Sequence, residues 1–115
     1  METEFPIYRI LDDAGQVTDT SKTDLLTKDL SLALFTHMNR IRTFDRKAIN
    51  LQRQGRLGTY APFEGQEAAQ VGSAYALQDK DWVFPTYRDH GATLTFGADM
   101  VRTFLYWNGR VEGCV

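Results

Sequence analysis

Apolar side chains recur at spacings of three and four residues between positions 30 and 51, and this pattern predicts one long helix with a single buried face. The members of that face are Leu30, Leu34, Met38, Ile41, Phe44, Ala48 and Leu51. Thr27 suits the N-cap, because a hydroxyl there can accept from a free backbone N–H of the first turn. Gly55 is expected to close the helix in the left-handed conformation. We interpret the basic residues of the second half as a solvated face: Arg40, Arg42, Arg46, Lys47 and Arg53.

Three shorter helices are predicted further along the chain. The first covers about residues 65–77, and its small side chains share one face that another backbone could approach closely: Gly65, Ala69, Gly72 and Ala76. The second covers residues 89–96 and is closed at Gly97. The third is capped by Asp99 and ends at residues 108–109.

Two stretches are predicted to be extended. Residues 5–17 form two short extended pieces around a turn at residues 12–15, and residues 18–23 follow as a polar linker. Residues 82–84 are predicted to form a short strand. Pro85 cannot donate to a sheet ladder, so that strand stops there or lies at a sheet edge.

The composition limits the kind of protein this chain can be. Its 115 residues, 43% of them hydrophobic, are enough for one domain with a modest core. A net charge of −2 argues against nucleic acid as a partner, and no apolar run approaches membrane-spanning length. The acidic first four residues are unlike a signal peptide. A single cysteine, Cys114, permits no internal disulfide, which fits a cytoplasmic protein.

The predicted strand delivers Tyr87 and Arg88 to its end, where a sheet stops and a ligand crevice can begin. Arg88 suits a phosphate or carboxylate, because its planar guanidinium offers parallel donors and stays charged. The structural alternative is a buried Tyr87 and an Arg88 paired with Glu64 or Asp89. The chain carries no glycine-rich nucleotide loop, no metal-ligand cluster and no complete set of catalytic residues.

Three segments resemble the α subunit of the E1 component of 2-oxo acid dehydrogenase complexes: GRLGTYAP (55–62), GQEA (65–68) and PTYRDHG (85–91). The resemblance implies an α/β fold, the thiamine diphosphate-binding fold, of which this segment is mostly helical with one or two short strands. Residues 1–23 are then an extended arm and linker. Residues 24–115 are expected to be the N-terminal part of the E1 α domain, truncated at its C-terminal end.

The resemblance also implies roles for particular residues. Tyr87 and Arg88 match the family's Tyr-Arg pair, in which Arg88 would bind the cofactor's phosphate and Tyr87 would hydrogen-bond near the phosphate or the substrate. Tyr60 and Ala61 match the loop at the substrate end of the cofactor, and Gln66 would help to hold that loop. The family's Gly-Asp-Gly motif with a downstream Asn is absent, so ligands of Mg²⁺ are expected beyond Val115.

Some pyruvate-specific members carry a histidine at the position of Ala61, which leaves pyruvate and branched-chain 2-oxo acids both open as substrates. We interpret His90 as a support of the loop rather than a proton-transfer group. Glu67 needs no role beyond a favourable charge at a helix N-terminus.

The function implied is thiamine diphosphate-dependent oxidative decarboxylation of a 2-oxo acid, with acyl transfer to a lipoyl group. The implied partners are an E1 β subunit, in an α2β2 heterotetramer, and the lipoyl-bearing E2 component. One alternative is an acetoin dehydrogenase α subunit, and another is a non-catalytic helical interaction module. The 115-residue chain by itself is expected to be catalytically inactive, because no complete active site is present.

Overall fold

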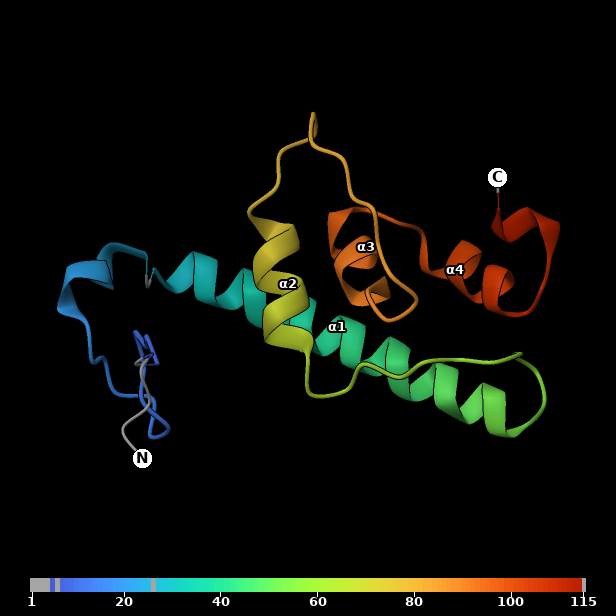
Figure 1. The fold of residues 1–115 in the computed structure, drawn as a ribbon, viewed down its shortest axis with the longest axis horizontal. Helices are drawn as coiled ribbons and strands as arrows, with labels where there is room; N and C mark the ends of the chain where they lie inside the picture. Colours follow the sequence, from blue (N-terminus) through green and yellow to red (C-terminus); the bar gives the residue numbers. More distant parts are fainter. Residues whose placement is uncertain (1–4, 6, 26, 115) are drawn as a thin grey trace. The chain divides into compact units, whose positions relative to one another are not determined.

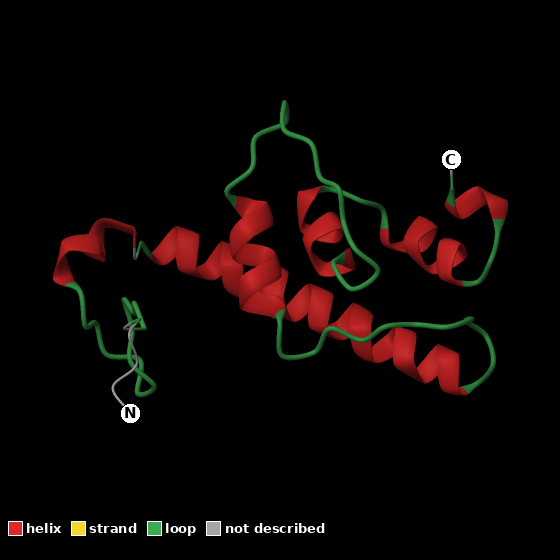
Figure 2. Ribbon diagram, viewed as in Figure 1, coloured by secondary structure: helices red, strands yellow, loops and turns green. Residues whose placement is uncertain are grey.

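The computed structural model describes residues 5, 7–25 and 27–114, and the regular elements among them are helices alone (Figure 2). The chain divides into two units, residues 1–32 and residues 33–115, and each is described by itself. In chain order the elements are η1 Thr20–Leu25, α1 Lys28–Arg53, α2 Glu67–Tyr75, α3 His90–Phe96, α4 Met100–Trp107 and η2 Val111–Gly113 (Figure 1). No helix in the described part of the chain is both long and apolar enough to cross a membrane.

Helix α1 begins and ends where the sequence predicts. The Oγ1 atom of Thr27 accepts from the backbone N–H of Leu30 at 3.2 Å, which confirms the N-cap. At the other end Gly55 has a φ of 70°, and Arg56 donates its N–H to the Leu51 carbonyl at 2.9 Å. Glycine is favoured there because a side chain would be strained in that conformation.

The core of residues 33–115 forms on the predicted face of α1. Ile41, Phe44 and Ala48 are buried, and the outer members of the face that lie in this unit pack against them: Leu34, Met38 and Leu51. After Gly55 the chain turns back and runs along α1 (Figure 1). From this returning segment Leu57, Tyr60 and Phe63 enter the core.

Helices α2, α3 and α4 complete this unit. The Phe104 ring of α4 stacks on Phe44 with 4.3 Å between ring centroids. The carbonyl of Trp107 accepts from Gly58 N–H at 2.9 Å, which ties the end of α4 to the returning segment. Asp99 accepts from Arg102 N–H at 2.8 Å, as predicted for its N-cap, while Gly97 closes α3 with a φ of 121°.

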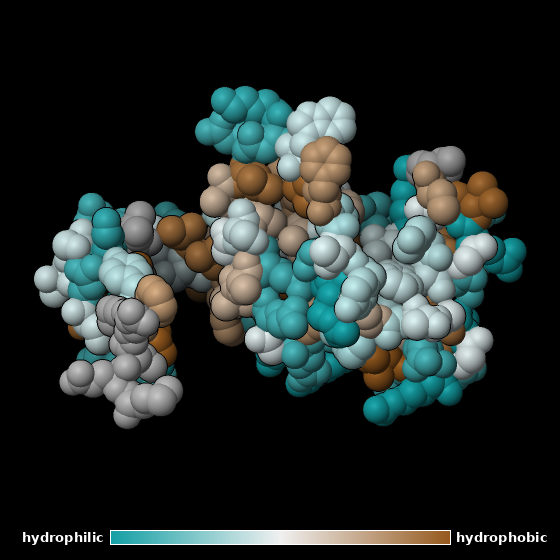
Figure 3. Space-filling model, in the orientation of Figure 1, coloured by the Kyte–Doolittle hydropathy of each residue, from teal (hydrophilic) through white to brown (hydrophobic). Residues whose placement is uncertain are grey.

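The predicted strand at residues 82–84 does not form. These residues belong to an irregular segment between α2 and α3 whose apolar side chains stand out from the surface (Figure 3). Trp82 is 82% exposed and Phe84 is 87% exposed. The described part of the chain offers no partner strand, and a lone extended segment has its backbone groups satisfied by water instead.

The N-terminal unit contains the predicted turn and, in addition, a short helix that was not predicted. Residues 5–17 contain the expected turn, in which Gly15 donates to the Asp12 carbonyl at 3.0 Å. The two extended pieces meet at an isolated antiparallel bridge between Leu11 and Val17. Thr18 N–H donates to the Ile10 carbonyl at 2.8 Å and Asp12 N–H to the Gln16 carbonyl at 2.9 Å, and no strand beyond this bridge forms among residues 7–17. Most of the expected linker lies in the short helix η1, Thr20–Leu25.

The small-residue face of α2 was expected to pack, and within this chain it does not. Gly65 lies before the helix with a φ of 96°, and the remaining members are exposed: Ala69, Gly72 and Ala76. The face that packs consists of Glu67, Gln70, Val71 and Ala74. Burial of Val71 and the hydrogen bonds of its two polar neighbours decide the orientation, which small side chains alone cannot.

Substitution of Gly91 by alanine should destabilise the unit. A Cβ at Gly91 would lie 2.6 Å from Gln70 Oε1, 2.9 Å from Ile41 Cδ1 and 3.0 Å from Phe63 Cε2. These neighbours are buried and cannot swing away, so Gly91→Ala is expected to lower the free energy of unfolding by about 1–3 kcal/mol. Urea denaturation measures the change.

The matched control is Gly72→Ala, also within a helix. A Cβ at Gly72 would meet no atom within 4 Å, so this variant should gain about 0.5–1 kcal/mol from helix propensity. Equal effects of the two substitutions would contradict the close approach of α2 and α3.

Candidate cofactor-binding site

The Tyr87–Arg88 pair lies in a turn that leads directly into α3. The Asp89 carboxylate fixes this turn, because Oδ2 accepts from the N–H of Thr86 at 2.9 Å and from its hydroxyl at 2.7 Å. The hydrogen bond from the Thr86 hydroxyl, followed by that from its N–H, lowers the pKa of Asp89. The turn is thus held by local bonds before any ligand is considered.

Neither structural alternative for the pair is found. Tyr87 is 71% exposed rather than buried. In the described part of the chain no carboxylate forms an ion pair with Arg88, because Glu64 pairs with Arg46 at 2.6 Å and Asp89 bonds to Thr86. The Arg88 guanidinium instead donates to the Pro62 carbonyl and lies over the Tyr87 ring, 5.5 Å from its centroid.

Gln70 on α2 joins the turn to the segment that contains Gln66. Its Nε2 donates to the Arg88 carbonyl at 3.0 Å and to Gln66 Oε1 at 3.2 Å. Its Oε1 accepts from Ala92 N–H at 3.1 Å. The structure therefore brings Arg88 together with Pro62 and Gln66, which lie more than 20 positions earlier in the sequence.

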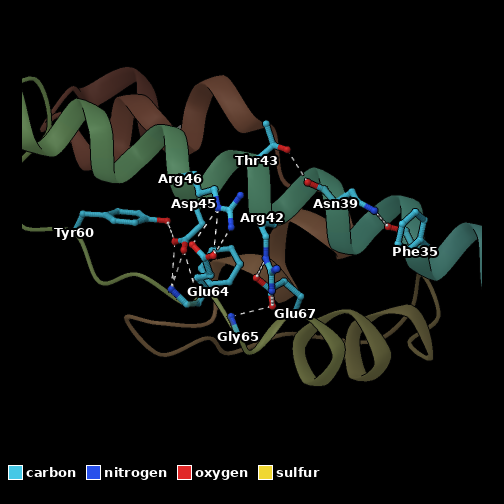
Figure 4. A network of polar contacts seen from close by, with 11 residues as sticks. Phe35, Asn39, Arg42, Thr43, Asp45, Arg46, Tyr60, Glu64, Gly65 and Glu67 are labelled. Atoms are coloured by element: carbon cyan, nitrogen blue, oxygen red, sulfur yellow. Dashed lines mark hydrogen bonds and ion pairs between the residues drawn. The ribbon is translucent and has the colours of Figure 1, made fainter. Parts of the chain in front are cut away.

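Asp45 of α1 holds the segment that contains Tyr60 (Figure 4). Its carboxylate is 1% exposed and accepts from the Tyr60 hydroxyl at 2.7 Å, from Phe63 N–H at 3.2 Å and from Glu64 N–H at 2.9 Å. Burial, followed by the hydrogen bond to Asp45, raises the pKa of Tyr60 far above its ordinary value. The hydroxyl of Tyr60 is thus occupied by a structural bond, and its predicted contact with substrate stays a prediction.

Two ion pairs add to this anchor. Arg42 donates to Glu67 through Nε at 2.7 Å and Nη2 at 2.8 Å, and Glu67 also accepts from Gly65 N–H at 2.9 Å (Figure 4). Arg46 pairs with Glu64 in the same region. Both arginine side chains remain partly exposed, at 42% and 62%, as the solvated-face interpretation expects, and they also bond to the segment before α2. Glu67 correspondingly does more than place a charge at a helix N-terminus.

His90 is buried among aromatic rings, as a supporting residue would be. Its ring centroid lies 5.0 Å from that of Tyr60, 4.9 Å from that of Phe63 and 5.4 Å from that of Trp107. Burial lowers the pKa of His90, while nearby Asp45 and a hydrogen bond with the Ala61 backbone act in the opposite direction. The ring therefore connects the start of α3 to the half-buried Ala61.

Two hollows lie beside this arrangement. One, of about 710 Å³, is lined in part by Tyr87 and His90, and the other, of about 390 Å³, by Gln66 and Gln70. Across the described residues no group of three or more histidine, cysteine, aspartate or glutamate side chains is placed to hold a metal ion. The Mg²⁺ ligands predicted beyond Val115 are not tested by this structure.

Asp45 and Gln70 are residues that the sequence reasoning missed. Asp45 stands four residues after Ile41 and three before Ala48, so it lies on the apolar face of α1. A charge in that register indicates a buried acceptor and could have been recognised. Gln70 offers a weaker indication, because its spacing of three from Glu67 matters only once the packing face of α2 is known.

Comparison with known proteins identifies the class. Residues 36–114 match the model of the family described as dehydrogenase E1 component, and the chain belongs to that family. The predicted resemblance to E1 α subunits is thereby confirmed.

Particular relatives carry the name pyruvate dehydrogenase E1 component subunit alpha, from Staphylococcus aureus (strain COL) and from Staphylococcus epidermidis. The chain is 38% identical to each over 112 residues, which cover 97% of this chain and 30% of the relative. It thus spans about a third of the length of the curated relatives that it matches.

Removal of the Asp45 carboxylate should be costly. Asp45→Ala leaves two buried donors and one partly buried donor without their acceptor, so the free energy of unfolding should fall by about 3 kcal/mol or more. Tyr60→Phe removes one donor and leaves the others paired, so its cost should be smaller. Asp79→Ala, in an exposed turn, is the control and should stay within about 0.5 kcal/mol. Similar losses of unfolding free energy for Asp45→Ala and Asp79→Ala in chemical denaturation would refute the role of Asp45 in holding the segment that contains Tyr60.

Acid should weaken the unit in part through Glu67. The hydrogen bond from Arg42 lowers the pKa of Glu67 from its ordinary 4.5 to about 2, despite burial. Because the unfolded chain binds this proton more readily, the stabilisation is present above pH 4.5 and is lost as the pH falls towards 2. Glu67→Gln should therefore flatten the decline of melting temperature over this window. Glu112→Gln, at an exposed glutamate of η2, should leave the decline unchanged.

Proposed function

We propose that this chain supplies diphosphate-binding residues to the α subunit of a thiamine diphosphate-dependent 2-oxo acid dehydrogenase E1 component. The observation that carries the proposal is Arg88, whose guanidinium has no carboxylate partner among the described residues and stands beside an exposed Tyr87. Membership of the dehydrogenase E1 component family supports it.

The residues present fit the diphosphate end of the cofactor. Arg88 retains donors beyond the one used on Pro62, and the exposed Tyr87 hydroxyl can donate a further hydrogen bond. Thiamine diphosphate, when bound, supplies the electron sink that allows a carbon–carbon bond of the substrate to break. The part played by this chain is to hold the anion and to fix the loop that contains Tyr60 and Ala61 beside it.

The substrate proposed is pyruvate or a branched-chain 2-oxo acid, with acyl transfer to a lipoyl group on E2. An E1 β subunit in an α2β2 assembly is the proposed partner, and Mg²⁺ accompanies the cofactor. The Ala61 side chain has no group that could donate to a substrate carboxylate, so any side-chain donor in this assembly comes from another residue. The proposed setting is the cytoplasm.

The choice among substrates is tested in a chimera. This chain replaces the matching stretch of the Staphylococcus aureus subunit, and the assembled enzyme is assayed with dichlorophenolindophenol as acceptor. Turnover of a 2-oxo acid supports the proposal, while turnover of acetoin alone would assign the acetoin dehydrogenase function.

The exposed small-residue face of α2 favours the helical interaction module as second candidate. That module predicts no effect of Arg88 on any cofactor.

Arg88→Ala should weaken thiamine diphosphate binding by about 1.5–3 kcal/mol, because a charged hydrogen bond is lost. Arg88→Lys should recover only part of the affinity, since an ammonium group lacks the two parallel donors of the guanidinium. Isothermal titration calorimetry measures both. Arg53→Ala, at the exposed end of α1, is the control for loss of a positive charge and should bind as the unaltered protein does.

The 115-residue chain alone should show no turnover of pyruvate, because its sequence lacks the Gly-Asp-Gly motif and downstream Asn that the resemblance associates with the metal site. Detectable turnover by the purified chain would overturn the proposal that it supplies only part of an active site.

A further inference from the structure

Gln70 is a buried polar side chain at the centre of the proposed site, and the proposed function gives it no role. It lies one turn into α2 and is 6% exposed. A primary amide buried to this degree costs free energy unless its donors and acceptor are paired. The identity of its partners therefore indicates what the residue is for.

All of its polar atoms are engaged, and its donors point toward the anion site. Both Nε2 bonds end on site residues: the Arg88 carbonyl at 3.0 Å and Gln66 Oε1 at 3.2 Å. The Oε1 bond from Ala92 N–H, at 3.1 Å, fixes which way the amide faces. Because Ala92 also donates to the Asp89 carbonyl, the Gln70 side chain is inserted into the turn that starts α3.

The packing leaves the amide no alternative position. Gly91 approaches so closely that a Cβ there would lie 2.6 Å from Gln70 Oε1. Ile41 and Phe63 close the same space from the core, at 2.9 and 3.0 Å from that Cβ. A side chain confined in this way connects α2 rigidly to the Arg88 main chain.

We propose that Gln70 is a positioning residue for the diphosphate site: its amide holds the Arg88 main chain, and the Pro62 carbonyl holds the guanidinium, so that the arginine is ordered before the anion binds. An arginine on an unanchored turn would lose conformational freedom on binding, and this loss would reduce affinity. The inference rests on the proposed function, because it assumes that Arg88 binds a diphosphate.

The test uses the 115-residue chain and inorganic pyrophosphate as the probe, titrated by calorimetry. Gln70→Met keeps the length and volume of the side chain but removes its amide. It should weaken pyrophosphate binding about 3- to 10-fold, the effect of one neutral hydrogen bond, against about 10- to 100-fold for Arg88→Ala. Gln78→Met, at an exposed position after α2, is the matched control and should bind as the unaltered chain does.

A double variant separates positioning from general stability. If Gln70 acts through Arg88, then adding Gln70→Met to Arg88→Ala should cause no further loss of pyrophosphate affinity. The melting temperature, in contrast, should fall with Gln70→Met in either background. A full additional loss of affinity in the double variant would overturn the inference.

The possible failures are distinguishable. If Arg88→Ala binds pyrophosphate as tightly as the unaltered chain, or if that chain binds none, the proposed function fails and the inference fails with it. If Arg88→Ala weakens binding but Gln70→Met does not, the inference alone is wrong.

A second measurement needs no variant, in case Gln70→Met does not fold. In the unaltered chain the side-chain amide protons of Gln70 should exchange with solvent at least about 10-fold more slowly than those of Gln78. The reason is that the two Gln70 protons are hydrogen-bonded and buried, whereas the Gln78 side chain is exposed. Equal exchange rates of the two amides in NMR spectra would contradict a rigid connection through Gln70.

Discussion

A buried carboxylate organises residues 33–115. Asp45 receives the Tyr60 hydroxyl and two backbone N–H groups of the returning segment, which has no regular secondary structure to pair them. In a low-dielectric interior such bonds are strong when complete and costly when broken, so the segment has one favourable course along α1. The ion pairs Arg42–Glu67 and Arg46–Glu64 then place the start of α2. The positions of α2 and of the turn that contains Arg88 depend on that placement.

The proposed anion site depends on this arrangement, because its residues are held by the same segments. The Arg88 guanidinium bonds to Pro62 within the segment that Asp45 holds, and the Arg88 main chain bonds to Gln70 of α2. The proposed cofactor-binding pair and the proposed substrate-side loop are therefore connected by hydrogen bonds within this chain. A disturbance at either place should be transmitted to the other through bonds that are a few ångströms long.

Elements that depend on local contacts could be predicted, and elements that need a distant partner could not. Helix α1, its cap at Thr27 and its end at Gly55 follow from spacing and capping within one turn. Residues 82–84 carry strand-forming side chains, yet a strand also needs a neighbour that the sequence pattern does not supply. The packing face of α2 was misassigned for the same reason, because small side chains permit contact without requiring it.

By itself the sequence determined helix α1 with both its ends, the presence of α2, α3 and α4, the family and an Arg88 suited to an anion. These depend on periodicity, on the φ preference of glycine and on short motifs, all of which are local. Only the tertiary structure decided that Arg88 stays free of Glu64 and Asp89, that Tyr60 bonds to Asp45 and that Gln70 joins three segments. Those outcomes are set by hydrogen bonds between residues 15 to 26 positions apart, and no local preference specifies which donor meets which acceptor.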